Sequence, residues 1–440
     1  MANFLITVWP FPGHFYPFLS IAHSLSRRGH RVAFYTGARM CEVAEREGFY
    51  GFRFSHLDEK ALFNLLLSPN ARSKSLLRRN LDLKYTLRRW LVDTIPQQIA
   101  DIELVLKQWK VDAIVCDPTV WSPILVLYEK KEIPVAVASL AVGCMLPGKD
   151  APPFGTALPP PRTMVRKWGT RLASAFMTLY SLDVRKSASR IRKRYGLPPL
   201  KSTVMEYMRQ MPLHFVPSCP QLDYKRRDLP PHVHYVGPYR WRRPQAENPP
   251  EWLKRIPRDH PWIHVTEGTV HVDAPLLLKA AAEGLAGHPV QVIMSTGGNR
   301  EPEDIDLGLH APNIHLKKWI YHSDLFPFID LLVTTGGAGN VLTALSEGIP
   351  MVIIPTEWDK PENARRVVEA GVGIQIAPHL LTPTRLVSAI YRILNDSSFK
   401  QRAQKIAAAF SNLGGAEQVA KLLESMLPSS TSFAKGNSND

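Results

Sequence analysis

Short apolar runs alternate with amphipathic segments along most of the chain. Each run has the length of a buried strand, and most are followed by apolar positions at the spacing of a helix. Such runs cover residues 3–9, 30–35, 112–116, 133–139, 214–217 and 234–237, and then 262–266, 290–295, 314–317, 328–333 and 351–354. A strand, a helix and a second strand within about 35 residues imply a parallel pair with a right-handed crossover. The pattern therefore predicts an α/β protein.

Helices and loops are predicted between these strands. Two long stretches, 57–106 and 162–195, combine helical spacing with basic side chains, and 399–426 is predicted to be helical as well. The segment 151–161 contains too many prolines for regular structure, so we predict a long loop there. Pro10–Gly13 is predicted to be the turn between the first strand and the first helix.

The stretch 328–373 predicts an anion site. Its first strand runs into a glycine-rich turn, and apolar positions from Val341 onward predict a short helix that Gly348 ends. The first N–H groups of a helix have no partner within it, and the helix dipole is positive at that end. A glycine turn that leads into a helix therefore favours a bound phosphate. The polar string 356–363, after the next strand, predicts a polar pocket beside the phosphate.

Two α/β halves of similar size predict two domains. We expect an N-terminal domain at 1–236, a linker at 237–250, a C-terminal domain at 251–427 and a disordered tail at 428–440. Proline and charge mark the linker, and polar composition marks the tail. Ligands of doubly wound sheets bind at the C-terminal ends of the strands, so two such domains are expected to share a central cleft.

Composition and charge narrow the class of protein. The 440 residues are 45% hydrophobic and 21% charged, as in globular proteins, with a net charge of +15. Because no signature of a nucleic-acid-binding module accompanies this charge, an anionic small molecule is the favoured partner. We expect no membrane-spanning helix and no signal peptide, because the longest apolar run is too short and the N-terminus lacks a basic region. The four cysteines lack zinc spacing, so we expect free thiols in the cytoplasm.

Four motifs, in order along the chain, carry a resemblance to a known family. They are Pro12-Gly13-His14-Phe15-Tyr16-Pro17, Val236-Gly237-Pro238, Gly268-Thr269 and the stretch 328–373. Over nearly its whole length the chain resembles the nucleotide-sugar-dependent glycosyltransferases of the GT-B fold, family GT1. The resemblance implies two doubly wound Rossmann-like domains that face a central cleft, with the acceptor in the first domain and the nucleotide sugar in the second.

The resemblance also implies a reaction. A hexosyltransferase-type enzyme would move a sugar, with inversion, from a UDP- or dTDP-sugar to a hydroxyl of a lipophilic small molecule. Macrolides and other polyketides, flavonoids, terpenoids and sterols are the acceptor types of this family, which serves natural product glycosylation in secondary metabolism. We expect no cofactor and no metal, because backbone N–H groups at the glycine turn can stabilise the leaving diphosphate. A monomer or a homodimer would suit this reaction.

Two residues are predicted to be catalytic. His14 follows the first strand, where a neutral imidazole could take the proton of an acceptor hydroxyl. Asp117 ends a later strand, where a carboxylate on the second imidazole nitrogen would fix the tautomer. The family uses a histidine and an aspartate at these places for those tasks. The structural alternatives are a histidine that satisfies a turn and an aspartate that caps the turn before Pro118.

The resemblance assigns the donor site to the second half. The predicted residues are Gly268, Thr269, Trp319, Ile320, His322, Thr335, Gly336, Gly337, Ala338, Gly339, Asn340, Asp359 and Lys360. Trp319 is expected to stack on the base unless it is a core tryptophan. The glycine turn would receive the diphosphate. Asp359 would accept hydrogen bonds from sugar hydroxyls unless it only caps the helix that Pro361 opens.

Three residues depart from the family pattern. Thr335, Thr343 and Lys360 stand where relatives often have His, Glu and Gln, which leaves the sugar and the choice between UDP and dTDP open. These departures motivate one alternative, a non-catalytic nucleotide-sugar-binding partner protein, although the retained His14 and Asp117 speak against it. A second alternative is a transferase peripheral to the membrane with a lipid or carotenoid acceptor, because 72–89 and 162–194 mix basic and apolar residues. Solvated basic helix faces are the simpler interpretation of those stretches.

Overall fold

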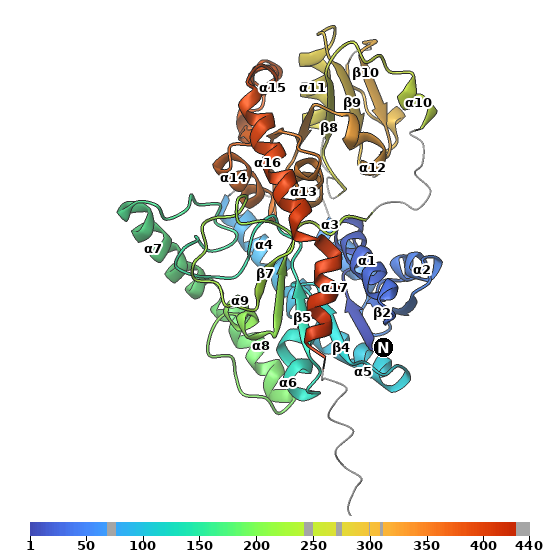
Figure 1. Ribbon diagram of the computed structural model, residues 1–440. Helices are drawn as coiled ribbons and strands as arrows, with labels where there is room; N and C mark the ends of the chain where they lie inside the picture. Colours follow the sequence, from blue (N-terminus) through green and yellow to red (C-terminus); the bar gives the residue numbers. More distant parts are fainter. Residues whose placement is uncertain (68–75, 242–249, 270–274, 299, 309–310, 428–440) are drawn as a thin grey trace, which may run out of the picture.

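The structure, a computed structural model, describes residues 1–67, 76–241, 250–269, 275–298, 300–308 and 311–427, and of 67 and 76–80 only the backbone (Figure 1). The chain folds into two α/β units, each built on one parallel sheet, as the sequence predicts. The predicted disordered tail and most of the predicted linker lie outside the described residues. No helix in the described ranges is long and apolar enough to cross a membrane.

The first sheet has seven parallel strands in the order β3-β2-β1-β4-β5-β6-β7. Their bounds are β1 Asn3–Thr7, β2 Arg31–Thr36, β3 Tyr50–Arg53, β4 Ala113–Cys116, β5 Val135–Ala138, β6 Leu213–Val216 and β7 Val233–Tyr235. β1 and β4 are neighbours with Phe4 opposite Ala113, although more than a hundred residues separate them. The order of strands reverses between them, which makes this the point of the sheet where ligands bind.

The second sheet has six parallel strands in the order β10-β9-β8-β11-β12-β13. Their bounds are β8 Trp262–Thr266, β9 Gln291–Ser295, β10 Ile314–Lys317, β11 Leu331–Thr334, β12 Met351–Ile353 and β13 Gly373–Gln375. Here the order reverses between β8 and β11, which pair with Leu332 opposite His264. The pattern did not predict β3 or β13, because both are short edge strands whose residues are partly exposed.

Helices cover both faces of each sheet. In the first unit they are α1 Pro12–Arg27, α2 Ala38–Arg46, α3 Glu59–Leu67, α4 Leu76–Leu91, α5 Ile95–Gln108, α6 Tyr128–Lys130, α7 Met164–Tyr180, α8 Leu182–Arg194 and α9 Val204–Tyr207, with a π-helix at Pro123–Leu127. In the second half of the chain they are α10 Glu251–Lys254, α11 Leu276–Leu285, α12 His322–Leu325, α13 Ala338–Ser346, α14 Lys360–Glu369, α15 Pro383–Asn395, α16 Ser397–Leu413 and α17 Gly415–Ser425. Short 3₁₀ turns lie at Met208–Gln210, Pro302–Asp304, Phe326–Phe328 and Pro378–Leu380.

Two predicted boundaries were wrong. The turn predicted at Pro10–Gly13 ends at Phe11 and α1 begins at Pro12, because a proline is well tolerated in the first helical turn, where its missing N–H has no partner to lose. The single helix predicted at 399–426 is broken at Gly414, whose φ of +81° is left-handed and ends α16. The predicted loop at 151–161 contains no helix or strand, and all four cysteines are free and buried, as predicted.

Because the helix is broken at Gly414, the last helix packs against the first unit. α17 runs alongside α1 (Figure 1), and Val419, Ala420 and Leu423 are fully buried in the core beneath the first sheet. Arg28 on α1 donates two hydrogen bonds to Glu424. This helix falls within the range 251–427 that the sequence assigned to the C-terminal domain, yet it packs against the N-terminal unit.

Candidate active site

The two reversal points of the sheets carry several of the predicted site residues. His14 lies in the first turn of α1, directly after β1, and Asp117 follows β4. In the second unit, Gly268 follows β8 and Thr335 follows β11. Parallel strands end at one edge of a sheet, so each pair of loops converges on one place.

One large cleft joins these places. Its volume is about 1990 Å³, and residues of both units line it, including every predicted site residue except Gly336. A pocket for one drug-sized ligand is typically about 300–1,000 Å³, so this cleft has room for two substrates at once. Gly336 shapes the turn instead. Its φ is +92°, and a Cβ there would meet the Ile353 side chain at 2.8 Å.

His14 and Asp117 form a hydrogen-bonded pair. Nδ1 of His14 lies 2.6 Å from Oδ2 of Asp117, and the aspartate is fully buried while the imidazole side chain is 28% exposed. The other carboxylate oxygen, Oδ1, accepts hydrogen bonds from the backbone N–H and the hydroxyl of Thr119. Asp117 therefore caps its turn with one oxygen and orients His14 with the other. The two interpretations drawn from the sequence describe the same side chain.

The pair sets the protonation of the imidazole. Burial lowers the pKa of His14, but the charge and hydrogen bond of Asp117 and the more distant Asp359 raise it, and the pKa ends above its ordinary value. With Nδ1 turned to Asp117, Nε2 is the nitrogen available to a ligand in the cleft. Asp359 belongs to the second unit, so its effect on His14 also shows that the two halves of the site are close.

The glycine turn after β11 leads into α13. Gly337 is the N-cap of this helix and makes no side-chain capping bond, and Gly337, Ala338, Gly339 and Asn340 all line the cleft. The first N–H groups of α13 have no partner within the helix, and the positive end of its dipole lies here. The turn therefore has the chemistry of an anion site, as the sequence predicts.

Thr335 is one of the predicted donor-site residues, but its hydroxyl is bonded within the protein. Its hydroxyl donates to the backbone carbonyl of Glu267 at 2.9 Å, which ties the end of β11 to the end of β8. Glu267 itself lines the cleft. Burial raises the pKa of its carboxyl group to about 7, although the Leu277 N–H donates to it. Glu267 is absent from the predicted site residues; its signal in the sequence is a charged residue directly after a buried strand.

Three of the predicted donor-site residues, Trp319, Ile320 and His322, occupy different environments. The Trp319 side chain is 41% exposed and lines the cleft, so it is not a core tryptophan. Ile320 is buried in the core of the second unit, which leaves only its backbone for contacts with a ligand. His322 packs against Phe326, and burial followed by the neighbouring His264 lowers its pKa to about 3, so the ring is neutral.

Asp359 and Lys360 begin α14, on the side of the cleft that faces His14. Asp359 is the N-cap of α14 but makes no capping bond; its Oδ2 accepts from the Asn363 side chain at 2.8 Å. Nζ of Lys360 donates to the Thr356 hydroxyl. Trp358, which the sequence analysis missed, has a left-handed φ of +63° and packs on Trp90 of the first unit. A bulky residue in this conformation is strained, so the contact between the two units holds the approach to Asp359 in place.

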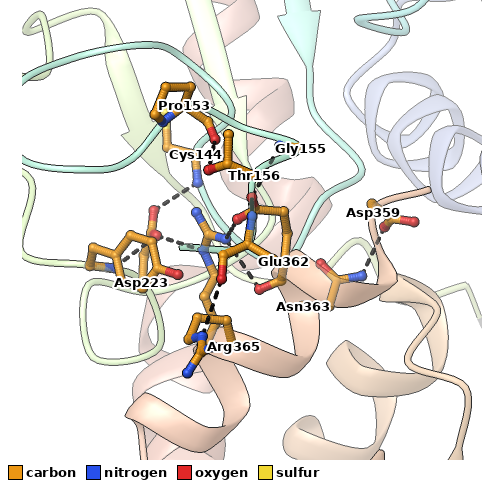
Figure 2. A network of polar contacts seen from close by, with 12 residues as sticks. Cys144, Pro153, Gly155, Thr156, Asp223, Asp359, Glu362, Asn363 and Arg365 are labelled. Carbon is orange, nitrogen blue, oxygen red and sulfur yellow. Dashed lines mark hydrogen bonds and ion pairs between the residues drawn. The ribbon is translucent and has the colours of Figure 1, made fainter. Parts of the chain in front are cut away.

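A buried network links α14 to the first unit (Figure 2). Glu362 accepts hydrogen bonds from the backbone N–H groups of Gly155 and Ala157, in the proline-rich loop. Arg366 donates to Asp223 at 2.8 Å and to Glu362 at 3.0 Å, and all three side chains are at most 3% exposed. The helix that presents Asp359 and the loop that lines the first half of the cleft are therefore one hydrogen-bonded assembly.

Acidic groups suited to a metal do not gather in the cleft. Asp304 and Asp306 have an Asp-x-Asp spacing, but both are exposed, and neither lines the cleft. Among the described residues, no group of three or more His, Cys, Asp or Glu side chains is arranged to hold a metal ion. The sequence-based expectation that no metal is used stays a prediction.

Known proteins resemble the chain over almost its whole length. Residues 292–426 match the family described as erythromycin biosynthesis protein CIII-like, C-terminal domain. The chain is 28% identical to the 4'-demethylrebeccamycin synthase of Lentzea aerocolonigenes over 97% of this chain and 100% of that protein. It is 25% identical to the demethyllactenocin mycarosyltransferase of Streptomyces fradiae over 97% of this chain and 87% of that protein. It is 26% identical to the zeaxanthin glucosyltransferase of Pseudescherichia vulneris over 99% of this chain and 100% of that protein.

Solved structures share the fold. The kitacinnamycin glycotransferase superposes with a TM-score of 0.73 at 19% identity, over 97% of this chain and 99% of that one. A Streptomyces glycosyltransferase complexed with thymidine diphosphate superposes with a TM-score of 0.65 at 18% identity, over 97% of this chain and 100% of that one. The family match, the relatives and the shared fold support a glycosyltransferase with the GT-B fold, similar to those of the GT1 type.

Proposed function

We propose that this glycosyltransferase moves a sugar from a UDP- or dTDP-sugar to a hydroxyl of a lipophilic small molecule, with inversion at the anomeric carbon. The observation that carries the proposal is the 2.6 Å contact between His14 and Asp117 at the reversal point of the first sheet. A base oriented in this way is needed by an enzyme that activates a hydroxyl, and a protein that only binds nucleotide sugars has no use for it.

In the proposed step, Nε2 of His14 takes the proton of the acceptor hydroxyl as the oxygen attacks the anomeric carbon. A carbon–oxygen bond forms on one face of the sugar, and the bond to the diphosphate breaks on the other, so the diphosphate leaves with the electron pair. Asp117 stabilises the imidazolium that results. His14 and Asp117 thus serve the acceptor half of the reaction.

The donor half rests on the second unit. The glycine turn and the first N–H groups of α13 would bind the diphosphate and stabilise its charge as it leaves, without a metal. Trp319 offers an exposed indole face for the base, and Asp359 offers a carboxylate for the sugar hydroxyls. A structural neighbour with thymidine diphosphate and relatives named for glucose and mycarose transfer support this class of donor.

The lining of the cleft supports a lipophilic acceptor. Phe11, Leu87, Trp90, Met145 and Phe154 of the first unit contribute apolar side chains to the cleft, and Phe11 packs on His14. Relatives named 4'-demethylrebeccamycin synthase and zeaxanthin glucosyltransferase support a small-molecule acceptor from natural product chemistry. Apolar walls with few polar groups are typical of pockets for such compounds.

A donor and acceptor panel tests the proposal. The protein is incubated with UDP- and dTDP-sugars and hydroxylated polyketides, flavonoids, sterols and carotenoids, and products are identified by mass spectrometry. We expect a glycoside together with release of the nucleoside diphosphate, and NMR of a product from an α-linked donor should show a β-linkage. Retention of the α-configuration would contradict the mechanism. Nucleotide binding without any turnover would favour the non-catalytic alternative.

A further inference from the structure

Helix α7 carries its apolar side chains on the outside of the molecule. Trp168 is 58%, Leu172 70%, Phe176 63% and Leu179 66% exposed. Every residue of this helix is described, and among them only Thr170 is buried. In Figure 1, α7 lies at the left edge of the first unit, away from both sheets.

The polar side of α7 faces the protein. Lys167, Thr170, Ser174 and Thr178 line the cleft and recur at spacings of three and four residues, so they share one side of the helix. Val165, Trp168, Leu172 and Leu179 recur in the same way on another side and do not line the cleft, and we call them the apolar face of α7; the exposed Phe176 also lines the cleft. An ordinary surface helix buries its apolar stripe. The inverted arrangement of α7 marks an interaction surface.

Charge around this face indicates what it binds. The sequence of α7 contains Arg166, Lys167 and Arg171 and no acidic residue, and Arg171 lies over the Trp168 ring. The next helix, α8, is also strongly basic, and its one acidic residue, Asp183, is paired with a lysine of α4 at 3.0 Å. Aromatic and leucine side chains flanked by cations match an anionic lipid surface. The apolar side chains can insert among the acyl chains, and the anionic headgroups attract the cations.

We propose that the apolar face of α7 docks on an anionic lipid bilayer. The helix then lies between the membrane and the cleft, with its apolar side in the lipid and its polar side toward the site. Docking of this kind is independent of the proposed reaction. Only its consequence rests on that reaction: an acceptor dissolved in the bilayer would reach His14 without crossing bulk water.

Vesicle co-sedimentation tests the docking. We expect the full-length protein to bind phosphatidylcholine vesicles that contain about 30% phosphatidylglycerol, more weakly without the anionic lipid, and more weakly again at about 0.5 M salt. The variant Trp168→Gln/Leu172→Gln/Leu179→Gln changes exposed residues that do not line the cleft. Its partition coefficient should fall by about 100-fold, because three apolar side chains no longer enter the lipid.

A matched variant controls for the loss of exposed leucines. Leu104, Leu276 and Leu380 are also exposed but lie on other elements, and their replacement by Gln should leave vesicle binding unchanged. Both variants should keep wild-type circular dichroism and turnover of a water-soluble acceptor. Three results would overturn the proposal: no binding of the wild type to anionic vesicles, equal binding by the two variants, or a wild-type dimer in light scattering that the α7 variant dissociates. Vesicle binding without glycosyl transfer would refute the proposed reaction and leave the docking intact.

Discussion

At the scale of single residues, the site depends on how His14 and Glu267 are ionised. Asp117 is fully buried and holds His14 through Nδ1; burial lowers the pKa of the imidazole, but the charge and hydrogen bond of Asp117, together with Asp359, raise it above its ordinary value. Glu267 lies in the donor half of the cleft, where burial raises the pKa of its carboxyl group to about 7. His14 and Glu267 each give the activity a pH dependence with its own sign.

Replacing Asp117 by Asn should change both the rate and its pH profile. His14 must be neutral to accept a proton, so kcat/KM should rise with pH on the acid side as the imidazole deprotonates. Asp117 raises the pKa of His14, so in Asp117→Asn burial dominates and the acid limb should move to lower pH. The rate itself should fall by about 10²- to 10⁴-fold, because the tautomer is no longer fixed. An unshifted acid limb would show that Asp117 does not act on His14.

Glu267 should couple nucleotide binding to pH. A carboxylate repels a diphosphate in the same cleft, so binding should weaken as pH rises through about 7 and Glu267 ionises. Titration calorimetry of UDP or dTDP in buffers of different ionisation enthalpy should show proton uptake near neutral pH. Glu267→Gln should abolish that uptake and flatten the dependence; an unchanged profile would place the ionising group elsewhere.

At the scale of elements, the buried network joins the two halves of the site. Glu362 of α14 holds the loop at Gly155 and Ala157, and Arg366 joins the same helix to Asp223. A Cβ at Gly143 would lie 1.9 Å from Nε of Arg366, so only glycine lets the first unit approach this closely. The side chains of Glu362, Arg366 and Asp223 lie behind Asp359 and do not line the cleft, whereas Gly155 of the loop does.

Glu362→Gln should weaken acceptor binding more than donor binding. The amide can still accept from the loop, but it loses the charge that pairs with Arg366, and hydrogen bonds to charged groups are the stronger ones. We expect the KM of the acceptor to rise about tenfold while the donor Kd stays within about twofold. Glu369→Gln on the same helix is the control, because its partner Arg162 is exposed. Equal effects of the two variants would argue against a positioning role for the network.

Local sequence patterns could predict the strands and helices that carry the site residues. They could not predict the hydrogen bonds and packing contacts between those elements. Buried apolar runs identified β1, β4, β8 and β11, whose ends carry His14, Asp117, Gly268 and Thr335. The bond from Thr335 to Glu267 and the strained backbone at Trp358 depend on residues that are distant in sequence or on backbone angles. No periodicity encodes such contacts. The same is true of the bond between Arg366 and Asp223, which are 143 residues apart.

At the scale of the whole molecule, α17 fastens the C-terminal end of the chain to the N-terminal unit. The sequence pattern continued through Gly414 as one amphipathic helix, and only the left-handed glycine redirects it. Leu423→Ala should leave a cavity between α17 and the first sheet and cost about 2–5 kcal/mol. Hydrogen exchange should therefore accelerate in α1 and β1 and stay unchanged in the second sheet. Lys421→Ala, at an exposed position of α17, should have no such effect.

The central claim is that His14 is the base of a glycosyl transfer carried out between the two units. The most direct measurement compares nucleoside diphosphate release by the wild type, His14→Ala and His23→Ala with the best donor and acceptor of the panel. His23 is a matched control, because it lies on the same helix and pairs with Glu47 at 2.9 Å, outside the cleft. We predict a loss of about 10²- to 10⁴-fold for His14→Ala and wild-type turnover for His23→Ala. Undiminished release by His14→Ala would contradict the claim.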